Sequence, residues 1–122
     1  MSNLTADWRD RPTHRRVWAL AAPTVEEAQY HLTSRVLSRI NRDRGVLGPL
    51  LSPDDAAKML RSADPERIAR IRRDSFAGTG PQVMERIVEL KDRVGVDEMA
   101  VVTWTWDEAV RRQSYSELAR AF

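Results

Sequence analysis

The sequence predicts an α/β fold in which buried parallel strands alternate with helices. The apolar stretches 16–22 and 99–104 are typical of strands that are covered on both faces. Each of them is followed directly by a helix-capping pattern, and strands separated by helices indicate parallel βαβ units. A length of 122 residues allows one domain with one modest core. We therefore treat residues 1–122 as a single domain.

The first unit is a strand followed by a long helix. Pro23 closes the apolar stretch 16–22, and Thr24 with Glu27 forms a capping box that starts a helix. Gly45 supplies the C-terminal stop of this helix. Its apolar residues recur at helical spacing: Val25, Ala28, Leu32, Val36 and Ile40.

Residues 45–74 read as a helical insert between strands. After the turn-rich stretch 45–49, Ser52 with Pro53 and Asp64 with Pro65 each combine a capping residue with a first-turn proline. We expect two short helices there. Their predicted inward residues are Ala56, Met59, Leu60, Ile68 and Ile71.

The remaining chain repeats the order of strand and helix twice. Residues 75–78 are a short strand candidate, and the capping turn 79–82 starts a helix that Gly95 ends. After the strand 99–104, the stretch 105–108 forms a further capping box and starts the last helix. The predicted core positions of these two helices are Val83, Ile87, Leu90, Val94, Ala109, Val110, Leu118 and Phe122.

Composition excludes several classes of protein. With 42% hydrophobic and 31% charged residues, the chain has the composition of a soluble globular protein, and no apolar run approaches the roughly 18 residues that span a bilayer. Cysteine is absent, which excludes disulfides and thiolate chemistry. Residues 1–14 are polar and lack the apolar core of a secretory signal. We expect a cytoplasmic location and no membrane partner.

The positive charges are almost all arginine, which supplies 18 of the 20 basic residues. Nucleic-acid binding would require Arg35, Arg39, Arg42 and Arg44 to form one face, but no aromatic residues that could stack on bases are interleaved with them. We expect a solvated helix face there and no nucleic-acid partner.

The common catalytic motifs are also missing. His14 and His31 stand apart from each other and have no carboxylates at metal-ligand spacing, so no metal site is predicted. Neither a nucleophile elbow nor a P-loop occurs. The adjacent acids Asp107 and Glu108 suit the first turn of a helix, where negative charge complements the helix dipole.

Taken in order, several short motifs resemble the C-terminal portion of luciferase-like flavin-dependent monooxygenases. The resemblance covers nearly the whole chain, and it depends on the joint order and spacing of the motifs. They are Thr24 to Ala28 after a strand, Arg44 to Leu50, Gly78 to Val83, Gly95 to Met99, and the closing stretch from Ser114 and Tyr115 to Ala121 and Phe122.

This resemblance implies a fold and a cofactor. Members of the family are (β/α)₈ barrels that use reduced flavin mononucleotide (FMN) or a deazaflavin, in many cases with a separate reductase. The chain resembles only the last three strands of such a barrel. The expected fold is therefore a partial (β/α) barrel of about three parallel strands and about five helices. We expect a homodimer or hetero-oligomer to cover its apolar sheet edge.

The same resemblance suggests where FMN would bind. Gly78 and Thr79 precede a helix whose N–H groups could hold a phosphate, although ordinary helix capping explains the same residues. Trp104 and Trp106 follow a strand and could stack on the flavin ring, although packing in a core or an interface explains them as well.

The sequence leaves two functions open and predicts no catalytic residue. The first is a fragment or subunit of a luciferase-like flavin-dependent monooxygenase, not catalytically complete alone because the upstream strands supply much of the flavin pocket in the family. The second is a non-catalytic oligomeric interaction module derived from that family.

Overall fold

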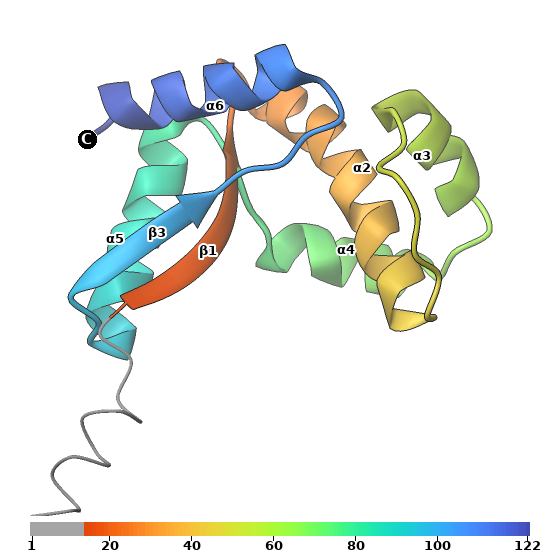
Figure 1. Cartoon of the computed structure of the whole chain (residues 1–122), viewed down its shortest axis with the longest axis horizontal. Coiled ribbons are helices and arrows are strands. Elements are labelled where there is room, and N and C mark those ends of the chain that lie inside the picture. Colours follow the sequence, from red (N-terminus) through yellow and green to blue (C-terminus); the bar gives the residue numbers. More distant parts are fainter. Residues whose placement is uncertain (1–13) are drawn as a thin grey trace, which may run out of the picture.

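The computed structural model describes residues 14–122, so all but one residue of the polar segment 1–14 lies outside it. Three strands and five helices follow one another along this part of the chain (Figure 1). In chain order they are β1 (His14–Ala21), α2 (Val25–Asp43), α3 (Pro53–Leu60), α4 (Pro65–Asp74), β2 (Phe76–Gly78), α5 (Gly80–Val94), β3 (Glu98–Val102) and α6 (Glu108–Arg120).

The three strands form one parallel sheet in the order β2-β1-β3. β3 pairs with residues 14–18 of β1, whereas β2 pairs only with residues 19–21. The fold is therefore α/β with three parallel strands in an open sheet and five helices, which is consistent with a partial β/α fold. The predicted helical insert 45–74 contains α3 and α4.

The central place of β1 divides the helices between its two faces. The connection from β1 to β2 and the connection from β2 to β3 run in opposite directions across the sheet, and right-handed crossovers then place their helices on opposite faces. Leu20 packs into a core with α2, α3 and α4, while Ala19 and Ala21 pack with α5 and α6. Figure 1 shows these two groups of helices on opposite sides of the molecule.

The predicted caps are confirmed for four of the helices. The hydroxyl oxygens of Thr24 and Ser52 and the carboxylate of Asp64 accept hydrogen bonds from the first turns of α2, α3 and α4. Gly95 ends α5 in the left-handed conformation, with a φ of 70°. In each case a short polar side chain or a glycine satisfies a local backbone requirement without any help from distant residues.

The start of α6 differs from the prediction. The capping residue is Asp107 and not Thr105, because the Asp107 carboxylate accepts the Ala109 N–H at 2.9 Å. The Thr105 hydroxyl instead donates to the main-chain oxygen of Asp107.

Four predicted core residues are exposed, and one of them, Ala109, lies in the first turn of α6. Val25 lies in the first turn of α2, where the helix has only begun to pack, and Met59 lies on the outer face of α3. Phe122 follows the end of α6 and is 98% exposed. The first strand also departs from burial on both faces: residues 19–22 are buried, but Arg15 and Arg16 are exposed. β2 is too short to cover that half of β1.

Side chains complete the hydrogen bonding of β1 beyond the end of β3. The Thr103 hydroxyl donates to the main-chain oxygen of Ala19 at 2.6 Å, and Ser114 Oγ accepts the main-chain N–H of Ala21 at 2.9 Å. Thr103 and Ser114 are both buried. Their side chains provide the hydrogen bonds that a longer β3 would otherwise form with the carboxyl end of β1.

The two helices beside β3 approach each other at a glycine. A Cβ atom placed on Gly80 would lie 2.5 Å from the main-chain oxygen of Glu117 in α6. A residue with a Cβ atom would push α5 and α6 apart, so only glycine fits at this position.

We expect Gly80→Ala to lower the free energy of unfolding by about 1–3 kcal/mol, the usual range for overpacking a close contact. Gly48→Ala is the matched control, because a Cβ atom there meets no heavy atom within 4 Å. Urea unfolding followed by circular dichroism measures both variants. Equal stability of the two would show that α5 and α6 do not meet at Gly80.

We expect Ser114→Ala to lower the free energy of unfolding by about 1–3 kcal/mol, because the buried N–H of Ala21 loses its acceptor. Ser116→Ala removes the same hydroxyl from an exposed position of the same helix and should change stability by less than about 0.5 kcal/mol. The same denaturation experiment compares them. A Ser114 variant as stable as the Ser116 variant would contradict this role.

Candidate functional site

Gly78 and Thr79, the predicted phosphate contacts, lie at the junction of β2 and α5. Gly78 pairs with Ala21, and a Cβ atom on it would lie 2.6 Å from Gln82 Oε1. The Thr79 N–H donates to the same Gln82 oxygen at 3.1 Å. Gln82 therefore already satisfies one of the N–H groups that a phosphate would use, and helix capping accounts for both residues. Phosphate binding at this junction stays a prediction.

Trp104 and Trp106, the predicted flavin contacts, lie in the loop between β3 and α6 and have different surroundings. The Arg35 guanidinium carbon lies 4.9 Å from the centre of the Trp104 ring, and 44% of Trp104 is exposed. Trp106 is 57% exposed. Trp104 is therefore in contact with Arg35 of α2, and nearly half of its surface is exposed.

Arg35 is the least expected feature of this region. Its guanidinium also lies 4.3 Å from the centre of the Trp18 ring in β1, so the cation contacts two aromatic rings. Its Nε and Nη1 atoms are buried and have no hydrogen-bond partner among the described residues. Burial, assisted by repulsion from Arg39 and Arg42, lowers the pKa of Arg35 to about 10. The sequence-based expectation of a solvated arginine face is wrong at this position.

Arg72 provides a direct contrast within the same layer. Its guanidinium donates to the Gln29 main-chain oxygen at 3.0 Å and to the Thr33 hydroxyl at 3.0 Å, so it joins α4 to α2. Burial lowers the pKa of Arg72 as well, but its N–H groups have acceptors. The Arg35 guanidinium instead contacts two aromatic rings, and its Nε and Nη1 atoms have no acceptor among the described residues.

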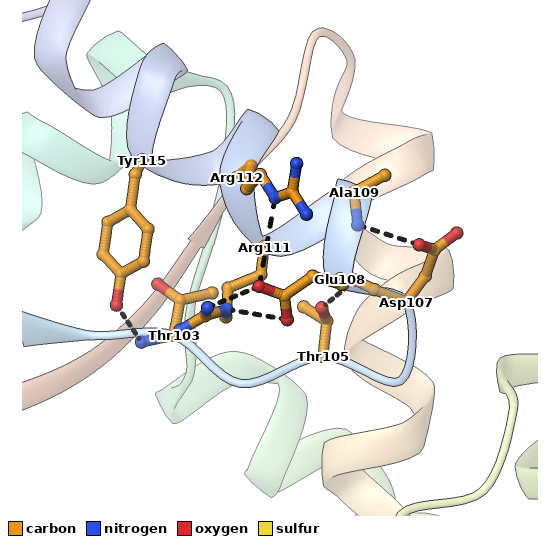
Figure 2. A network of polar contacts seen from close by, with 8 residues as sticks. All are labelled: Thr103, Thr105, Asp107, Glu108, Ala109, Arg111, Arg112 and Tyr115. Atoms are coloured by element: carbon orange, nitrogen blue, oxygen red, sulfur yellow. Dashed lines mark hydrogen bonds and ion pairs between the residues drawn. The ribbon is translucent and has the colours of Figure 1, made fainter.

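The polar residues after β3 fix the loop that carries the two tryptophans. Figure 2 shows the Tyr115 hydroxyl directed at the main-chain N–H of Thr103, which donates to it at 3.1 Å. Glu108 pairs with Arg111 and lies 3.9 Å from Arg112. The hydrogen bond from Arg111 lowers the pKa of the Glu108 carboxyl. Asp107 and Glu108 therefore serve the start of α6, as the sequence predicts.

Three hollows among the described residues are prominent, and none of these three is lined by the four predicted contacts. The largest, of about 740 Å³, lies beside the amino-terminal half of β1. We call it the basic groove. A second groove of about 540 Å³ is mostly apolar and lies along β3 between α5 and α6. The smallest, of about 160 Å³, lies between α2 and the loop that follows it.

The basic groove takes its charge from four elements. It is lined by seven arginines and three aspartates, an excess of four positive charges. Asp43 pairs with Arg67, and the Asp64 carboxylate caps α4. The arginines are Arg15 and Arg16 of β1, Arg35 and Arg39 of α2, Arg67 and Arg70 of α4, and Arg93 of α5.

Residues 14–122 also bear on the predictions about metal ligands and membrane-spanning segments. No group of three or more histidine and acidic residues could hold a metal ion in that range. The His31 ring packs edge-on against Tyr30 with 5.1 Å between ring centres, and burial lowers its pKa. No helix in that range is both long and apolar enough to cross a membrane.

Sequence reasoning missed both the Trp18–Arg35–Trp104 stack and the basic groove. The four arginines proposed as a nucleic-acid face do not act together, since Arg35 and Arg39 line the basic groove while Arg42 lines the smallest hollow. The available signal was a tryptophan and paired arginines within the amino-terminal half of a strand. Such residues are unexpected in a strand that is covered on both faces.

We expect Arg35→Met to leave the free energy of unfolding unchanged or to raise it by up to about 1 kcal/mol. Methionine keeps the apolar contact with both rings and removes buried N–H groups that have no partner. Arg35→Ala also removes the contact and should lower stability by about 1–2 kcal/mol. Thermal unfolding measures both, and a Met variant as unstable as the Ala variant would refute this account.

Comparison with known proteins gives a likeness of structure and none of sequence family. No family model matches the chain, and no curated protein matches it. The fold is similar to the crystal structure of apo-MsnO8, with a TM-score of 0.73 and 25% sequence identity. The similarity covers 88% of this chain and 34% of that chain, so the chain spans about a third of the length of MsnO8. The partial α/β arrangement described above thus occurs within a longer solved protein.

Proposed function

We propose that the chain is a part of a luciferase-like flavin-dependent monooxygenase and contributes one wall of a flavin pocket that further strands complete. The observation that carries this proposal is the position of Trp104. Its ring follows the carboxyl end of β3, is half exposed, and is held against Arg35. Ligands of parallel α/β proteins bind outside the carboxyl ends of the strands. The order of the family-like motifs along the chain supports the same proposal.

In this proposal the residues of the chain have distinct tasks. Trp104 supplies a flat apolar surface for the flavin ring, and Trp106 shields it from water. The start of α5, after Gly78 and Thr79, would face the phosphate through the N–H of Gly80, since Pro81 has no N–H. Bound reduced FMN would supply the oxygen chemistry, while the protein positions the ring and excludes water. Arg35 holds Trp104 in place.

One observation favours the alternative, a non-catalytic interaction module. Gly78, Thr79, Trp104 and Trp106 line none of the three hollows, whereas the two larger hollows lie along strand edges. Strand edges are the places where another chain pairs with a sheet. A module of this kind would use the edges and leave the carboxyl ends of the strands without a ligand.

Flavin titration tests whether this chain binds FMN on its own, which the interaction module would not do. We expect oxidised and reduced FMN to bind with a Kd at or below about 10 µM, equivalent to roughly 7 kcal/mol, once a pocket assembles. Flavin fluorescence anisotropy reports binding without depending on tryptophan emission. Trp104→Ala should weaken binding at least about tenfold, which corresponds to about 1.4 kcal/mol of lost ring contact.

The matched control is Trp8→Phe, which changes none of the predicted contacts and should bind FMN like the unmodified chain. Absence of saturation up to about 1 mM FMN, equivalent to roughly 4 kcal/mol, would contradict an autonomous flavin site and leave an interaction module or one half of a split enzyme. Equal binding by the Trp104 and Trp8 variants would remove Trp104 from the site.

A further inference from the structure

The floor of the basic groove is the free edge of β1. Main-chain groups of successive strand residues point alternately to the two sides of the strand. The Ala22 N–H donates to the Gly78 oxygen at 3.0 Å, so the even-numbered residues of this segment face the β2 side. Arg16 lies before the part of β1 that β2 reaches. Its N–H and C=O therefore face the groove, and no strand of residues 14–122 lies beside them.

The walls of the groove come from both helical layers. Arg39 and Arg70, from α2 and α4, stand on one side, and Leu90 and Arg93 of α5 stand on the other. Phe76 at the start of β2 closes one end. A slot with a strand edge as its floor and a helix layer on each side has the shape that an additional strand occupies in a sheet.

The groove also contains buried donors that lack acceptors. Arg35 Nε and Nη1 and the Trp18 Nε1 atom are buried without a partner among residues 14–122, and both residues line the groove. Arg39 and Arg70 are exposed and form no ion pair within the described part of the chain. Because Arg39 and Arg70 are exposed cations, an occupant with carboxylate oxygens would form charge-assisted hydrogen bonds with them.

From these observations we propose that the basic groove binds an acidic, extended peptide segment of another polypeptide, which pairs with residues 14–18 of β1 as an added strand. The main-chain groups of Arg16 would supply the pairing, and the arginines of α2 and α4 would select acidic side chains. Strand addition combines backbone hydrogen bonds with side-chain selection in this way. The inference does not rest on flavin binding.

Other occupants fit less of the geometry. Inorganic phosphate or nucleic acid would use the arginines but not the free strand edge. A second copy placed by two-fold symmetry would bring one basic groove against another, which like charge opposes. Only a peptide uses both the edge and the charge.

The test uses the full chain and a fluorescein-labelled hexapeptide that alternates valine with glutamate. We expect saturable binding by anisotropy, with at least tenfold weaker binding of the same peptide N-methylated at alternate residues. A peptide alternating valine with lysine should not bind. Amide hydrogen exchange should slow at Arg16 when the acidic peptide is present.

Variants locate the binding surface. Arg39→Gln combined with Arg70→Gln should weaken peptide binding at least tenfold. Arg44→Gln combined with Arg61→Gln removes the same charge from exposed residues that do not line the basic groove, and should bind like the unmodified chain. Circular dichroism confirms that all four substitutions leave the fold intact.

Each contrary result has a definite meaning. Equal binding of the N-methylated peptide would overturn strand addition. Complete competition by single-stranded DNA or by millimolar phosphate, together with that result, would assign the groove to polyanions instead. A dimer in sedimentation experiments that dissociates when the Arg39 and Arg70 substitutions are made would assign it to a second copy. None of these three results depends on whether the chain binds FMN. Failure of the peptide proposal can therefore be distinguished from failure of the proposed function.

Discussion

The structure depends on the hydrogen bonding of one strand, β1, which lies between two partners that are both too short for it. β3 covers its amino-terminal half and β2 covers its carboxyl end. At the carboxyl end the deficit is met by Thr103 and Ser114, whose side chains bond to the main chain of Ala19 and Ala21. A buried main-chain group without a partner is costly, so these two side chains determine where the loop after β3 and helix α6 can lie.

The alternation of side chains along β1 then divides the core. Ala19 and Ala21 are small, and α5 and α6 pack on that face, where Gly80 allows them to meet. Leu20 faces α2, α3 and α4. Trp18, two residues earlier on that same face, packs against this core and also contacts the Arg35 guanidinium. A single period-two pattern therefore produces both the core and the groove.

Local signals in the sequence were enough to predict the elements, because helix caps and glycine stops act within a few residues. Thr24, Ser52, Asp64 and Gly95 each end or begin a helix where expected. The site could not be predicted in the same way. Arg35 reads as one of several arginines on a helix, and its burial between two rings comes from residues 17 positions before it and 69 positions after it. Such contacts depend on the tertiary arrangement, which no local pattern encodes.

The part of β1 that β2 does not reach and the outer edge of β3 are both open, and they differ in chemistry. This difference constrains any assembly. The edge at β1 is bordered by arginines, and the edge at β3 is bordered by an apolar groove between α5 and α6. A closed two-fold dimer brings identical surfaces together, which suits an apolar groove but not a basic one. A closed two-fold dimer would therefore use the β3 edge, whereas the acidic peptide that we propose would use the β1 edge.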